Sequence, residues 1–112
     1  MSVVIHRFLL AGVSLALAAH VQAGNVAAGA EKAKTVCAAC HGADGNGVQA
    51  FPDYPKLAGQ HQDYLERTLR EYKSGGRKNA IMAPMAQTLT AKDIADVSAF
   101  YASQKGVLHV RR

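Results

Sequence analysis

Apolar residues recur at helical spacing in a stretch of the middle of the chain, residues 60–73. Charged side chains cover the other faces of this stretch, as expected for a helix that buries one side. Gly75 and Gly76 follow it, and glycine readily adopts the left-handed backbone that ends a helix. The apolar members are Tyr64, Leu65, Leu69 and Tyr72. The pattern predicts an amphipathic helix that stops at the two glycines.

A second helical pattern lies near the C-terminus. Thr90 and Asp93 have the spacing of a capping box, in which each side chain bonds the other residue's backbone N–H. The apolar positions behind it predict a helix that runs to about residue 104. Its apolar face contains Ile94, Val97, Phe100 and Tyr101.

The remaining segments predict one more helix and two long loops. Residues 27–39 are rich in alanine and poor in helix breakers, which favours a helix. Residues 41–59 hold four glycines and two prolines, and residues 77–89 form a second irregular stretch. No segment alternates as a strand would. We therefore predict an all-α fold with three main helices and long loops, which a large apolar cofactor could complete.

The N-terminal residues have the pattern of an export signal. Arg7 precedes an apolar run over residues 8–19, and Ala23 ends a small-residue cleavage pattern. A membrane anchor is the alternative, but the run is shorter than the ~20 residues that span a bilayer. We expect a signal peptide over residues 1–23, then a single domain over residues 24–112 with no membrane anchor. Removing Arg7 lowers the formal net charge from +5 to +4, and the scattered basic residues predict no nucleic-acid binding.

The chain has two cysteines, and both fall in Cys37-Ala38-Ala39-Cys40-His41. This is the C-x-x-C-H pattern of covalent haem attachment. The two thiols lie three positions apart on a helical turn and can each form a thioether to one haem. His41 then follows directly as a ligand of the iron. We predict one covalently attached haem c per chain, with His41 as an axial iron ligand.

Other chemistry fits the two cysteines less well. A thioredoxin-like redox pair expects a βαβ context, and no strand is predicted. A zinc site needs about four ligands, and His61 and His109 form no second paired motif. Each of these two histidines has the setting of a solvated surface residue.

The second axial ligand is open at this point. A methionine thioether is soft and neutral and raises the potential of the iron. Met82 and Met85, in the predicted loop before the last helix, are both candidates, and the other one would fill space in the core.

Four stretches in order resemble the class I c-type cytochromes of bacteria, in particular one domain of the periplasmic two-haem type and its single-haem relatives. They are residues 36–47, 54–60, 82–86 and 89–101. The resemblance implies that Met82 is the distal ligand and that Met85 packs. It also implies that the Pro55 carbonyl accepts the Nδ1 proton of His41, and that Gly29 lets the first helix cross closely against Phe100 or Tyr101. The two-haem relatives have a second copy of the domain, which this chain does not repeat.

The function implied by this resemblance is that of a periplasmic one-electron carrier with a low-spin haem. An iron with both axial positions filled leaves no site for a substrate, so no catalytic residue is expected. The expected partners are redox proteins (a reductase, an oxidase or a dehydrogenase) that dock transiently. Two alternatives stay open: a fixed haem subunit of a larger redox complex, and a haem sensor or enzyme with a replaceable distal ligand.

Overall fold

A computed structural model describes residues 12–14 and 23–108 of the chain. Of the predicted leader, residues 1–23, the structure describes only residues 12–14 and 23. His109 lies outside the described residues. The described part contains five helices and no strand, so the predicted all-α class is confirmed. In chain order the helices are α1 (Val26–Val36), α2 (Ala38–His41), α3 (Gln62–Ser74), α4 (Met82–Gln87) and α5 (Ala91–Ser103).

Two predictions of local structure need correction. The helix expected over residues 27–39 is divided at Cys37, whose backbone turns between α1 and α2. The stretch 77–89, expected to be a loop, contains α4. Pro84 is tolerated there because it lies in the first turn, where backbone N–H groups have no partner inside the helix.

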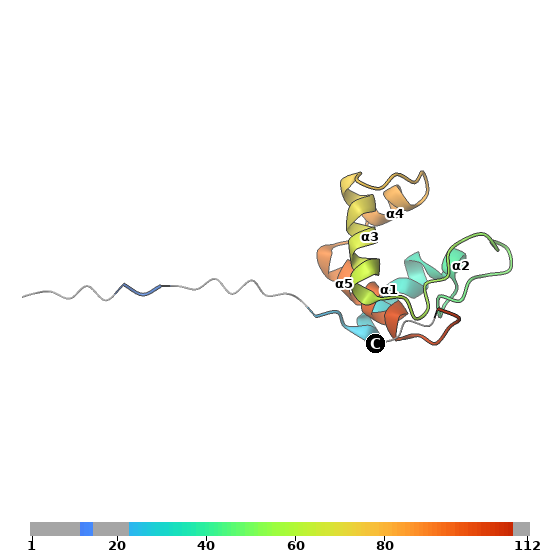
Figure 1. Ribbon diagram of the computed structural model, residues 1–112, viewed down its shortest axis with the longest axis horizontal. Coiled ribbons are helices and arrows are strands. Elements are labelled where there is room, and N and C mark those ends of the chain that lie inside the picture. Colours follow the sequence, from blue (N-terminus) through green and yellow to red (C-terminus); the bar gives the residue numbers. More distant parts are fainter. Residues whose placement is uncertain (1–11, 15–22, 109–112) are drawn as a thin grey trace, which may run out of the picture.

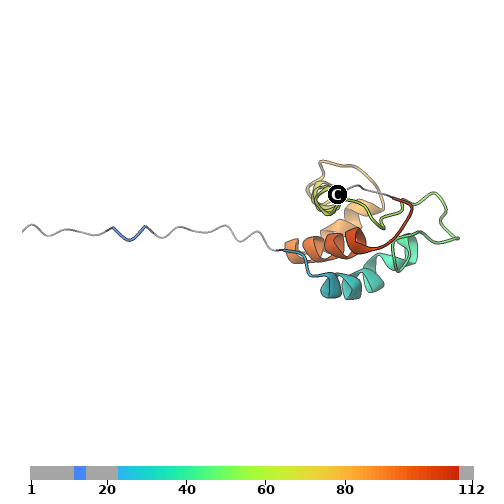
Figure 2. The same ribbon diagram turned by 60° about the horizontal axis from the view of Figure 1, so that its bottom comes forward.

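The centre of the fold is the contact between α1 and α5, which lie against each other in Figure 2. Gly29 makes this approach possible. A Cβ atom built on Gly29 would lie 1.9 Å from the carbonyl oxygen of Asp96 and 2.8 Å from Cβ of Phe100. The expected close crossing of Gly29 against Phe100 is therefore confirmed, and any larger residue would force the two helices apart.

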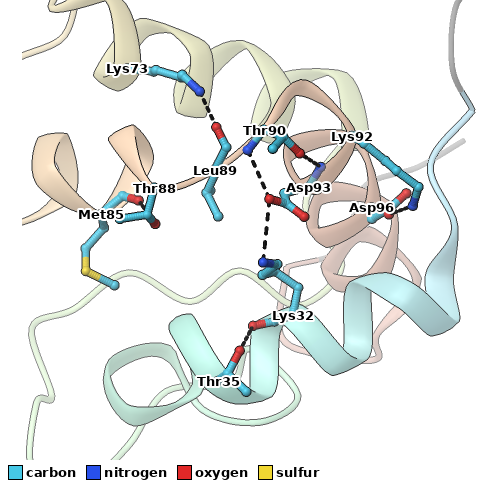
Figure 3. Close-up of polar contacts among 10 residues, drawn as sticks. All are labelled: Lys32, Thr35, Lys73, Met85, Thr88, Leu89, Thr90, Lys92, Asp93 and Asp96. Carbon is cyan, nitrogen blue, oxygen red and sulfur yellow. Dashed lines mark hydrogen bonds and ion pairs between the residues drawn. The ribbon is translucent and has the colours of Figure 1, made fainter.

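Polar contacts fix the ends of the same two helices. Asn25 caps α1, and its backbone N–H donates to Oδ1 of Asp96 over 2.8 Å. At the start of α5, Thr90 and Asp93 form the predicted capping box. Figure 3 shows the Asp93 carboxylate also facing Lys32 of α1, at 3.6 Å. These contacts tie the first helix to the last.

Helix α3 stands across this pair, and α4 packs on α3 (Figure 1). Ala33, Leu65 and Tyr101 form a buried cluster between the helices. Most of the core is small: six of the eleven buried apolar side chains in the described part of the chain are alanines. The helices thus enclose a core with little side-chain volume of its own.

Candidate cofactor site

The two cysteines and His41 share one short helical turn at the end of α1. The N–H of Cys37 donates to the Ala33 carbonyl over 2.9 Å, and the N–H of His41 donates to the Cys37 carbonyl over 3.0 Å. Gly42 ends the turn with a φ of 88°, a conformation that favours glycine, and a Cβ there would collide with the Gly47 carbonyl. The turn therefore presents both thiols and the imidazole from one rigid piece of backbone.

The loop that follows returns to the histidine. The Gly45 carbonyl accepts the N–H groups of both Leu57 and Ala58, at 2.7 and 3.1 Å, which closes the loop. This brings the Pro55 carbonyl oxygen to 2.8 Å from Nδ1 of His41. A carbonyl can only accept, so Nδ1 carries a proton, and in the neutral imidazole Nε2 then keeps its lone pair. The imidazole is buried and fixed in orientation, and Nε2 is the ring atom that could bind a metal ion.

A mostly apolar cavity of about 350 Å³ lies beside the turn. Cys37, Cys40 and His41 line it on one side, and α3 and α5 contribute the side chains of Leu65, Leu69, Val97 and others. Met82 and Met85, from α4, also line the cavity. The structure thus gathers every metal-ligating residue that the sequence predicted around one space.

Helix α4 places the methionines. The side-chain oxygen of Asn79 accepts the N–H groups of Ile81 and Met82, each at 2.9 Å, and so fixes the turn that leads into the helix. Met85 and Leu89 both point from this segment towards the side where α1 lies (Figure 3). Both methionines are half-buried, so their position alone does not assign the distal ligand.

Tyr101 joins α5 to the cysteine turn. Its buried hydroxyl donates to the Gly42 carbonyl over 3.3 Å. Burial raises the pKa of the Cys37 thiol to about 11. A hydrogen bond with Tyr101 and the charge of Lys32 act in the opposite direction, but their effects are smaller. Burial and the neighbouring Cys37 also raise the pKa of Tyr101. The free Cys37 thiol is therefore protonated at neutral pH and is a weak nucleophile by itself.

Several residues of the cavity were not predicted from the sequence. Tyr54, Tyr64 and Arg77 line it, and the Arg77 guanidinium lies 5.4 Å from the ring centre of Tyr72. Tyr101 was expected only to pack in the core. Its hydroxyl, on an otherwise apolar helix face, was the one feature of the sequence that could have indicated a polar contact at the site. His61, expected to be a surface residue, is exposed before α3 and is not among the residues that line the cavity.

The competing forms of cysteine chemistry find no support in the described residues. They contain no group of three or more His, Cys, Asp or Glu side chains that could hold a metal ion, as a zinc site would require. The strands of a thioredoxin-like context are also missing from residues 23–108. In the same part of the chain, no helix has the length and apolarity needed to cross a membrane.

Comparison with known proteins agrees with this geometry. The cytochrome c family profile matches residues 26–105. Cytochrome c-554(548) of Halomonas halodenitrificans is 50% identical over 86 residues, which cover 74% of this chain and all of that protein. A thiosulfate dehydrogenase electron acceptor of Thiomonas intermedia is 42% identical over 69 residues, covering 62% of this chain and 31% of the relative.

A solved structure shows the same fold. The reduced recombinant cytochrome c4 of Pseudomonas stutzeri superposes with a TM-score of 0.69 at 41% identity. The match covers 77% of this chain and 48% of that one, so this chain spans about half the length of the two-haem protein.

The residues around the cavity fit the cofactor of this family. Two adjacent thiols, an imidazole with a free Nε2 and an apolar wall are what a covalently attached haem c needs. Cytochromes c are electron-transfer proteins, and Cys37 and Cys40 supply the thiols for one haem c in this chain. With its profile match over residues 26–105 and a 50% identical relative, the chain belongs to the cytochrome c family.

Proposed function

We propose that this chain is a periplasmic one-electron carrier whose haem c has His41 and Met82 as axial ligands. The observation that carries the proposal is the common cavity of Cys37, Cys40, His41 and Met82, with Pro55 holding the His41 ring. When bound, the haem supplies the one-electron redox couple. The protein contributes covalent attachment, two ligands, an apolar wall and a docking surface.

Attachment is tested on a denaturing gel stained for haem. The exported protein should stay coloured after denaturation, and Cys37→Ala combined with Cys40→Ala should remove the colour. A colourless wild-type band from a host that matures c-type cytochromes would refute the attachment. N-terminal sequencing of the same material tests the leader, because the proposed cleavage after Ala23 leaves Gly24 first.

The distal ligand is tested with two matched variants. Met82→Leu should abolish the methionine–iron charge-transfer band of the ferric protein, and Met85→Leu should keep it, since leucine fills similar volume without a sulfur ligand. Loss of the band in Met85→Leu alone would assign the ligand to Met85 instead. An unchanged wild-type spectrum on addition of cyanide would speak against the sensor or enzyme alternative.

A fixed subunit of a larger redox complex is the second candidate. It is favoured by the similarity to the thiosulfate dehydrogenase electron acceptor of Thiomonas intermedia, which is about three times as long as the matched region. Size-exclusion chromatography of a native periplasmic extract distinguishes the two. A free carrier that docks transiently elutes near its monomer mass, whereas a subunit elutes with its partner.

A further inference from the structure

The segment that carries both methionines begins and ends at points that are tied together. It leaves the end of α3 and returns to Thr90, before α5. The Lys73 ammonium donates a hydrogen bond to the Leu89 carbonyl, as Figure 3 shows. In the opposite sense, the Gln87 side-chain amide donates to the Lys73 carbonyl. We call these two hydrogen bonds the Lys73–Gln87 brace.

The end of α3 is suited to this contact. The Lys73 carbonyl is one of the last four of the helix and has no acceptor role inside it, so the Gln87 amide satisfies a group left over by helix geometry. The Lys73 ammonium lies where the helix dipole favours positive charge. Lys73 forms no ion pair within the described residues, so its charge is directed to the Leu89 carbonyl.

Further contacts hold the segment between its two ends. The N–H of Arg77 donates to the Glu71 carbonyl over 3.1 Å, and the Asn79 side chain accepts the N–H of Met82 at the start of α4. Ala86 and Leu89 are 0% and 3% exposed, which anchors the far end of α4 in the core. The distance of α4 from His41 across the cavity therefore depends on this packing and on the brace together.

We propose that Lys73 and Gln87 are positioning residues that hold the methionine thioether towards the haem iron. The proposal rests on the methionine ligation proposed above. Without the brace, the packing of Ala86 and Leu89 alone holds α4, so the methionine leaves the iron more often and a coordination position opens to a ligand from solution. No electron or proton is transferred in this exchange, in which one neutral donor replaces another.

Imidazole binding to the ferric holoprotein measures this opening directly. Lys73→Leu and Gln87→Leu should each raise the apparent imidazole affinity about fivefold, the effect of losing one partly exposed hydrogen bond. Arg70→Leu is the matched control, because Arg70 lies on the same helix as Lys73 but its 2.9 Å bond goes to Glu66 within α3 and not to the methionine segment. It should leave the imidazole affinity within twofold of wild type.

The outcomes separate this proposal from the one it rests on. If wild type shows the methionine–iron band and both brace variants bind imidazole as wild type does, the brace is refuted and the ligation stands. An equal rise in Arg70→Leu would also refute the brace, because general destabilisation would then explain the effect. A wild-type protein without the band refutes the methionine ligation itself. Should Lys73→Leu fail to accumulate as holoprotein, Gln87→Leu decides.

Discussion

The Nδ1 atom of His41 donates to the carbonyl oxygen of Pro55 over 2.8 Å, and the loop that carries Pro55 is closed by hydrogen bonds at Gly45. A bond of this kind fixes the plane of the imidazole and makes Nε2 a stronger donor. A stronger donor stabilises ferric iron more than ferrous iron. With His41 as the proposed iron ligand, the loop after the cysteine turn would take part in setting the reduction potential.

Pro55→Gly should raise the reduction potential. Glycine keeps the carbonyl but frees the backbone that aims it, so the hydrogen bond to His41 weakens and ferric iron loses stabilisation. A loss of about 1 kcal/mol in one oxidation state corresponds to roughly 40 mV for a one-electron couple. Spectroelectrochemical titration measures the change. Pro52→Gly, at an exposed position of the same loop, is the control, and equal potentials in the two variants would contradict the role of Pro55.

Gly29→Ala should strongly destabilise the holoprotein. The added methyl group would overlap the Asp96 carbonyl oxygen, so α1 and α5 must separate, at a cost of about 1–3 kcal/mol. Guanidinium denaturation followed by circular dichroism gives the free energy of unfolding. In the control, Gly76→Ala, the new Cβ meets nothing closer than 3.4 Å. Indistinguishable midpoints for the two variants would show that the helices adjust without loss.

The Asp96 carboxylate should make part of the stability dependent on pH. The Lys92 ammonium and, second, the N–H of Asn25 hold the pKa of Asp96 below its usual range. A carboxyl whose folded pKa is lowered stabilises the fold above its unfolded pKa of about 3.9, and this contribution is lost as the pH falls through the folded value.

Asp96→Asn should accordingly cost about 1 kcal/mol at pH 7 and progressively less below pH ~4. The free energies of unfolding of wild type and variant, measured across this range, should converge in acid. Asp53→Asn, on the exposed loop, is the control and should follow wild type throughout. If the difference in free energy of unfolding between wild type and Asp96→Asn stays constant down to pH 2, the carboxylate charge is not its cause.

Ser98→Ala should leave the holoprotein as stable as wild type or more so. Ser98 is 1% exposed and lines the cavity, and its hydroxyl oxygen has no hydrogen-bond partner within the described residues. Removing a buried hydroxyl without a partner relieves a desolvation cost of about 1 kcal/mol. Thermal unfolding compares it with Ser103→Ala, whose exposed hydroxyl donates to the Phe100 carbonyl over 2.6 Å. A lower melting temperature for Ser98→Ala would mean that the loaded protein offers this hydroxyl a partner.

Local patterns predicted the parts of the fold that local physics determines. The apolar spacing of residues 60–73 and the capping box at Thr90 correspond to α3 and α5, because side-chain periodicity and capping act within a few residues. Helix α4 was not predicted, since its six residues include Pro84 and show no periodicity. It is stabilised by packing on α3, which depends on the tertiary structure, and by the local bonds of the Asn79 side chain, which were not predicted.

The same limit applies to the site. The cysteines and His41 are adjacent in sequence, so their chemistry could be predicted from spacing alone. Pro55 was named through a family resemblance, and its contact with His41 depends on loop closure at Gly45. The wall of the cavity, with Tyr54, Tyr64 and Arg77, is assembled from segments that no local pattern connects.

The alanine-rich core described above has a consequence for the life of the protein in the cell. Six alanines among eleven buried apolar residues leave the described part of the polypeptide with too little apolar contact to fold firmly around an empty cavity. A copy that misses its haem would stay open to proteases and be cleared, while a loaded copy would persist. The steady-state amount of this protein should therefore follow the supply of haem to the compartment. When haem attachment fails, the amount of the protein should fall, and inactive protein without haem should not accumulate.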